Sequence, residues 1–153
     1  MNLIADSLLT KDLRLTLKAS DHRDALEEIL SGLRSDTRVL DWEKLRSSLQ
    51  SNAGNEAFRE NSSTMFLHHS RTESVNGLVL AAGRSKEGLS LDARKQKIHL
   101  VLVAVIPTAL NNEYLRILGA VARVCRDPLS FRELLETTDP AGFLAILEKG
   151  CRQ

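Results

Sequence analysis

Hydrophobic and polar positions along the first third of the chain predict one strand followed by two helices. Leu13 to Lys18 alternates apolar and polar residues, the spacing of a half-buried strand. Ser20-Asp21 then offers a helix cap, and apolar residues recur at helical spacing from Ala25 to Leu33. A second helix is expected from Asp41 to Leu49, and the turn-forming residues 51–55 end it.

The middle of the chain has the character of a sheet. The short apolar run 64–67 leads into His68-His69-Ser70-Arg71, and 78–82 has the composition of a buried strand. Residues 83–88 are expected to form a loop because they are rich in glycine and polar residues. The run 98–106 is continuously apolar, which predicts a strand covered on both faces.

From Asn111 onward the pattern is helical. One stripe at helical spacing is expected to face the core, and its members are Leu115, Leu118, Val121, Ala122 and Cys125. Two shorter helices follow at about 129–136 and 141–149, and Thr138-Asp139-Pro140 is expected to cap the second. The sum predicts an α/β fold, a mixed β-sheet flanked by helices, in a single domain spanning 1–153.

Composition narrows the classes of function. The 153 residues are 42% hydrophobic and 27% charged, as in an ordinary soluble globule. A net charge of +1 and 4% aromatic residues argue against a nucleic-acid partner, which calls for a basic excess and stacking rings. The longest apolar run has about half the length of a membrane span. Cys125 and Cys151 show no disulfide pattern, and residues 1–6 lack the basic, apolar character of a signal, so we expect a cytoplasmic protein without a membrane span.

The pair His68-His69 is the most informative feature for chemistry. Adjacent residues of a strand point to opposite faces, so these two rings do not easily share a metal ion, and no third ligand stands at useful spacing. Cys125 and Cys151 have no metal-ligand partners either. We expect no metal and no cofactor. From the residues alone, two histidines without a task remain the commoner meaning of such a pair.

Four segments in order carry a resemblance to a known family. They are Leu67-His68-His69-Ser70-Arg71, Gly83-Arg84-Ser85-Lys86-Glu87-Gly88-Leu89, the strand from Ile98 to Pro107, and Phe131-Arg132-Glu133-Leu134-Leu135. With this order and spacing, the chain resembles the fructose, mannitol and nitrogen-regulatory class of enzyme IIA. These proteins are components of the bacterial phosphoenolpyruvate-dependent phosphotransferase system. The resemblance runs from the strand at Arg14 to the last helix and implies the family's sandwich of a mixed β-sheet and helices.

The resemblance also implies a site. His69 aligns with the histidine that accepts the phosphoryl group from a histidine-containing phosphocarrier protein (HPr-like). Arg71 would give electrostatic support, and Ser70 would leave room for the partner and offer its backbone N–H to phosphoryl oxygens. Tyr114 aligns with the family's second active-site histidine. Because no transporter domain is fused to the chain, a regulatory role is favoured, with a kinase or a transporter as a further partner.

Four departures from the family pattern keep a second hypothesis open. His68 stands where the family has proline, and the stretch from Arg59 to His68 contains none of the glycines that usually precede the acceptor. The family's upstream arginine has no counterpart near residues 52–54, and its second histidine is replaced by Tyr114. The chain is therefore either a regulatory enzyme IIA phosphorylated on His69 or a phosphorylation-incompetent binding module that acts through protein contacts.

Overall fold

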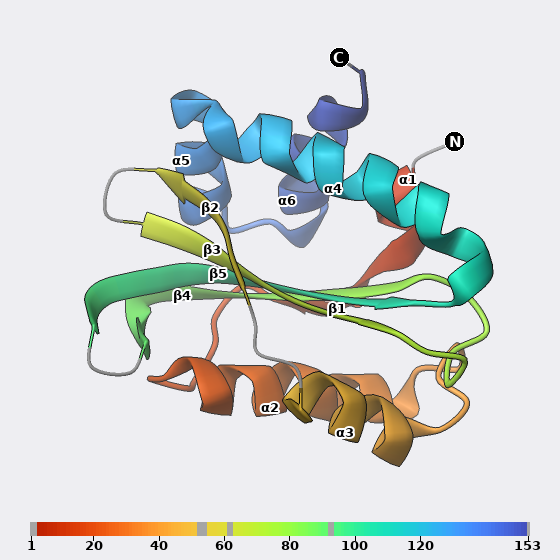
Figure 1. The fold of residues 1–153 in the computed structure, drawn as a ribbon. Coiled ribbons are helices and arrows are strands. Elements are labelled where there is room, and N and C mark those ends of the chain that lie inside the picture. The colour runs from red at the N-terminus through yellow and green to blue at the C-terminus, as the bar shows by residue number, and fades with distance from the viewer. Residues whose placement is uncertain (1–2, 52–54, 61–62, 92–93, 153) are drawn as a thin grey trace.

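The fold is built on one mixed β-sheet, which confirms the fold class expected from the sequence (Figure 1). The structure, a computed structural model, describes residues 3–51, 55–60, 63–91 and 94–152. The strands of the sheet are β1 (Leu8–Arg14), β2 (Asn55–Glu60), β3 (Ser63–Arg71), β4 (Val79–Leu91) and β5 (Arg94–Ile106). Their order in space is β1-β4-β5-β3-β2; β1 is parallel to β4 and β3 to β5, whereas the other two pairs are antiparallel.

Helices cover both faces of this sheet (Figure 1). One layer holds α2 (His22–Gly32) and α3 (Trp42–Ser51); the other holds α1 (Leu3–Ser7), α4 (Asn111–Arg126), α5 (Pro128–Glu136) and α6 (Pro140–Glu148). Two hydrophobic cores result, one on each side of the sheet. Strand β5 contributes Leu102 to one core and Val103 to the other, which confirms the expectation that it is covered on both faces.

The helix caps predicted from the sequence form as expected. The side chain of Asp21 accepts a hydrogen bond of 2.9 Å from the backbone N–H of Asp24 and so caps α2. At α6, Asp139 accepts from the N–H of Ala141 at 3.2 Å, and Pro140 occupies the first turn, where its missing N–H costs nothing. These local signals placed both helix starts correctly because they depend only on neighbouring residues.

The loop expected at 83–88 is wrong, because these residues belong to β4. A shift in register between Arg84 and Leu89 absorbs the irregularity, and Gly88 takes the positive φ of 93° that favours glycine. Arg84 is buried, and its guanidinium donates to the carbonyl oxygens of Leu15, Leu134 and Thr137. Arg84, one of the polar residues on which the expected loop rested, instead takes part in an internal hydrogen-bond network.

Two further sequence predictions need correction. The first strand spans Leu8–Arg14 rather than 13–18; after Arg14 the chain crosses to the other face, so that Leu13 and Leu17 lie in different cores. In α4 the core-facing stripe is rotated from the expected one. Tyr114 and Ile117 are buried, whereas Leu115 is 50% exposed. Since α1 and β2 carried no clear periodicity, the sequence did not predict them.

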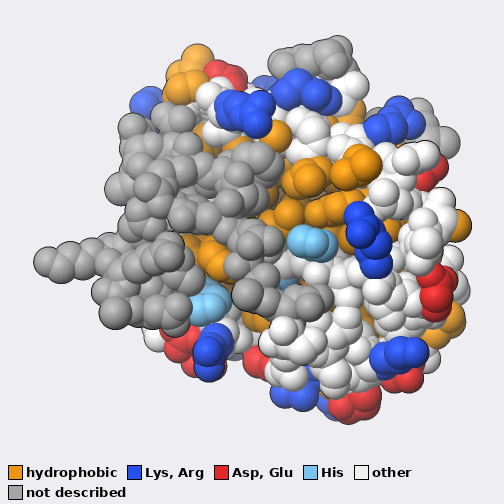
Figure 2. Space-filling view, in the orientation of Figure 1, with side chains coloured by type: hydrophobic (Ala, Val, Ile, Leu, Met, Phe, Trp, Pro, Cys, Tyr) orange, Lys and Arg blue, Asp and Glu red, His pale blue; other side chains and the backbone are white. Residues whose placement is uncertain are grey.

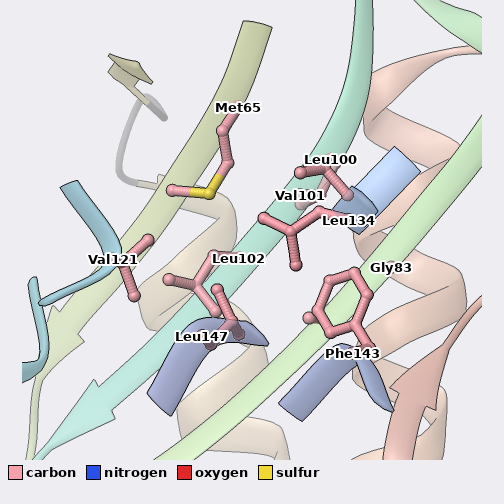
Figure 3. A pocket seen from close by; sticks show the side chains of 10 residues that line it. Met65, Gly83, Leu100, Val101, Leu102, Val121, Leu134, Phe143 and Leu147 are labelled. Atoms are coloured by element: carbon pink, nitrogen blue, oxygen red, sulfur yellow. The ribbon is translucent and has the colours of Figure 1, made fainter. Parts of the chain in front are cut away.

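The core beneath α4 contains a small apolar cavity of about 10 Å³ (Figure 3). Met65 of β3, Leu102 of β5 and Val121 of α4 point into it, and Phe143 and Leu147 of α6 close it. A space of this size is at the lower limit for one water molecule, and the lining offers almost no polar partner. We regard the cavity as a packing defect rather than a ligand site.

Candidate functional site at the end of β3

The side chains at the C-terminal end of β3 alternate strictly between the two cores. Leu67 packs in the core beneath α4, and Phe66 packs in the core over α2. The next residues continue this pattern, with His68 on the α2 side and His69 on the α4 side. The expectation that adjacent histidines face opposite ways is therefore confirmed, and the two rings have different environments.

His68 is an internal side chain. It is only 5% exposed, and its ring lies 5.3 Å from the ring of Phe66 and 6.5 Å from the ring of His22, to which it is nearly parallel. Both ring nitrogens are enclosed without a hydrogen-bond partner. Burial, with smaller contributions from the charges of His22 and His69, lowers the pKa of His68 to about 4. This ring is therefore neutral at pH 7 and inaccessible to a partner protein.

His69 lies in a more open environment. Its side chain is half-buried, and its ring centroid stands 6.1 Å from that of Tyr114, with 28° between the ring planes. Tyr114 is buried in the first turn of α4. Burial raises the pKa of the Tyr114 hydroxyl, and the positive charge of Arg71 acts in the opposite direction. The phenol therefore remains protonated at neutral pH, as an uncharged group beside the imidazole.

Arg71 ties the end of β3 to the start of α4. Its side chain is exposed, and its Nε donates a hydrogen bond of 2.9 Å to Oδ1 of Asn111, the first residue of α4. Glu73 anchors the preceding turn by accepting from the backbone N–H of Thr108 at 3.0 Å. These contacts hold a guanidinium close to the positive end of a helix, a combination that favours a negatively charged group nearby.

Three of the four predicted site residues thus come together on one side of the sheet: His69, Arg71 and Tyr114. On the face drawn in Figure 2, hydrophobic side chains gather in the middle, with a histidine and a basic side chain beside them. Ser70 is different. Its side chain is buried, and its hydroxyl pairs with that of Ser48 in α3, away from the other three. The small size of the Ser70 side chain therefore does not determine whether a partner protein can reach His69.

Sequence reasoning missed the partners that hold these groups. His22 neighbours His68 although the two lie 46 positions apart, and Asn111 binds Arg71 across 40 positions. No local pattern signals such contacts. The departures noted for the stretch from Arg59 to Thr64 and for residues 52–54 concern side chains that lie outside the described residues.

The described residues contain no group of three or more His, Cys, Asp or Glu side chains arranged to hold a metal ion. Among the helices of the same described ranges, none is both long and apolar enough to cross a membrane.

Comparison with known proteins identifies the family. The profile of the phosphoenolpyruvate-dependent sugar phosphotransferase system, EIIA 2, matches residues 7–150. The chain belongs to this enzyme IIA family. The resemblance inferred from the motifs around His69 is thereby confirmed for nearly the whole chain.

Solved structures of enzyme IIA proteins have the same fold. The nitrogen regulatory protein IIA-Ntr from Neisseria meningitidis superimposes with a TM-score of 0.79 at 18% identity, covering 95% of this chain and 99% of that one. IIA mannitol from Escherichia coli gives 0.68 at 18% identity, covering 90% and 96%. The complex of enzyme IIAMTL and phosphorylated enzyme IIBMTL from Escherichia coli gives 0.65 at 15% identity, covering 91% and 95%. A comparison with curated proteins gives no match.

Proposed function

We propose that this enzyme IIA protein accepts a phosphoryl group on His69 from a histidine-containing phosphocarrier protein and serves a regulatory role. The single observation that carries the proposal is the contrast between the two histidines. His69 is half-buried and lies on the side of Arg71 and Tyr114, whereas His68 is enclosed without partners. Only the former is open to an incoming protein.

The reaction requires little covalent help from the protein. A neutral ring nitrogen of His69 attacks the phosphorus of the partner's phosphohistidine, and the N–P bond to the partner breaks as the new N–P bond forms. Catalysis then consists of positioning and of charge stabilisation around the transferred group. Arg71, fixed by Asn111, and the positive end of α4 supply positive potential on the side where the phosphoryl oxygens arrive.

Tyr114 has a positioning role in this proposal. Its buried ring stands beside the His69 imidazole and limits the orientations of that ring. Because the phenol is uncharged at neutral pH, it leaves Arg71 as the principal cation among the described side chains of this group. A regulatory role fits the structural likeness to IIA-Ntr, a nitrogen regulatory protein by its name.

Phosphoryl transfer from phosphoenolpyruvate, through enzyme I and the phosphocarrier protein, tests the proposal. The intact chain should gain the mass of one phosphoryl group, and acid should remove it because N–P bonds are acid-labile. His69→Ala should abolish the gain, whereas His68→Leu, the matched control on the opposite face, should retain it. Loss of the gain in His68→Leu together with its retention in His69→Ala would reverse the assignment.

The charge assigned to Arg71 is tested separately. Arg71→Gln should lower the rate of transfer by about tenfold, because it removes a positioned cation near the developing charge. Arg132→Gln, at an exposed position on α5, removes the same charge away from β3 and should leave the rate unchanged. Equal effects of the two variants would show that only the overall charge matters.

The second candidate is a binding module of the same fold that is not phosphorylated. The feature that favours it is Tyr114, which by the resemblance aligns with the family's second histidine and places an uncharged hydroxyl there. In this case no mass gain occurs, and His69→Ala keeps its affinity for a partner protein. The transfer assay therefore distinguishes the two candidates directly.

A further inference from the structure

The outward side of α4 is a continuous surface that begins next to the His69 site. Its members, which we call the α4 outer face, are Asn112, Leu115, Arg116, Gly119, Arg123 and Arg126. The helix has 16 residues and is therefore about 24 Å long, enough to span one side of a small interface. Leu115 directly follows Tyr114, whose ring lies beside that of His69, so this face begins close to the His69 site.

This face combines an apolar anchor with basic charge. Leu115 is 50% exposed, one of the large hydrophobic side chains that the fold leaves in solvent, and Leu118 beside it is half-buried. Arg116, Arg123 and Arg126 are all exposed. Arginine is enriched at protein interfaces, and the rim of an interface is polar, so arginines around an apolar side chain fit the composition of an interface.

None of the six residues of the α4 outer face is acidic. Glu113 is the sole acidic residue of α4, and one oxygen of its carboxylate is enclosed by the protein. Arg71 adds a further exposed cation at the His69 end. Because the whole chain carries a net charge of only +1, this basic character is a local feature and not a general one.

We propose that the α4 outer face docks a protein partner that presents acidic side chains around an apolar residue. The inference rests on the proposed function only for the purpose of docking, which would bring the partner to His69 to donate a phosphoryl group or to recognise the phosphorylated form. A second copy of the chain fits less well, since two-fold docking would bring the arginines of one α4 against those of the other. The few aromatic residues and the small net charge disfavour nucleic acid as the occupant.

Two synthetic helical peptides provide the probes. One carries leucines at positions i and i+4 flanked by glutamates, and the other has lysine in place of each glutamate. Nuclear magnetic resonance titration of the unphosphorylated full chain with the glutamate peptide should shift α4 amides saturably and should spare α2 and α3. Raising the salt from 50 to 500 mM should weaken this binding about tenfold. The lysine peptide should give no saturable shift.

Charge reversal identifies the arginines involved. Arg116→Glu with Arg126→Glu should weaken the glutamate peptide about tenfold and allow the lysine peptide to bind. Arg123 is left in place because its Nε donates to the carbonyl oxygen of Gly150 at 2.8 Å. Arg23→Glu with Lys44→Glu makes the same change in charge at exposed positions of α2 and α3, and should have no effect.

Several results would overturn the inference. They are equal binding of both peptides, absence of saturable binding, shifts confined to α2 and α3, saturable binding of a single-stranded oligonucleotide to α4, or dimerisation of the chain alone through α4. The titration uses unphosphorylated protein, so its failure leaves the phosphorylation of His69 standing. A chain that binds the glutamate peptide but never gains a phosphoryl group would retain the docking surface and lose the proposed function.

Discussion

Acid should destabilise this protein through His68. In the folded chain the ring is enclosed, and burial lowers its pKa from 6.5 to about 4. In the unfolded chain the same ring is solvated and has an ordinary pKa near 6.5. The unfolded state therefore binds a proton at a higher pH than the folded state. The free energy of unfolding is therefore independent of His68 above pH 6.5, and it falls as the pH decreases from 6.5 toward 4.

The size of the effect follows from the difference in pKa. At pH 5 the unfolded ring is almost fully protonated and the folded ring is not, which costs about 2 kcal/mol of unfolding free energy relative to pH 8. His68→Leu removes the titration and replaces an imidazole whose nitrogens have no partner with an apolar side chain. The variant should be at least as stable as the parent at pH 8.

Urea unfolding of both proteins at pH 8, 7, 6 and 5 measures this directly. The free energy of unfolding of the parent should fall by about 2 kcal/mol more than that of His68→Leu, and most of the difference should develop below pH 6. His99, whose pKa is also lowered by burial, is present in both chains and cancels in the comparison. Parallel pH profiles would refute the reasoning and indicate that His68 is solvated or hydrogen-bonded.

Other predictions concern packing and internal hydrogen bonds. Arg84→Met should lower the unfolding free energy by about 3 kcal/mol in urea, because the buried guanidinium binds three carbonyl groups that would lose their donor. Gly150→Ala should lower the melting temperature, because a Cβ at this position overlaps the carbonyl of Ala120. Gly119→Ala should raise the free energy of unfolding by up to about 1 kcal/mol, because alanine favours a helix and the Arg123 side chain, 3.6 Å away, leaves room for a Cβ. Val121→Ile adds a methyl group at the apolar cavity and should raise the melting temperature slightly, and a decrease would show that the cavity cannot receive it.

Local signals allowed much of the fold to be predicted from the sequence. Asp21 and Asp139 marked helix starts because a cap depends on the next few residues alone. The continuous apolar run from Ile98 to Ile106 marked a strand buried on both faces, as β5 is. The loop expected at 83–88 was wrong because Arg84 finds its hydrogen-bond partners in segments up to 69 positions distant.

The candidate site was predictable only in part. The alternation of a strand was enough to place His68 and His69 on opposite sides. Which of the two is enclosed depends on Phe66 and His22, and the latter comes from a different layer of the fold. The orientation of α4, which exposes Leu115 and buries Tyr114, was set by packing against the sheet. This orientation of α4 matters because it places the Tyr114 ring beside His69 and leaves Leu115 exposed.

The central claim is that the His69 imidazole is the phosphoryl acceptor, and phosphoramidate tests it without any partner protein. This small donor should phosphorylate the accessible imidazole of the purified chain, and peptide mass spectrometry under alkaline conditions should find the phosphoryl group on His69. A known histidine phosphocarrier treated in parallel confirms that the donor is active. Modification of His68 or His22 in place of His69, or none at all while the control is phosphorylated, would contradict the account.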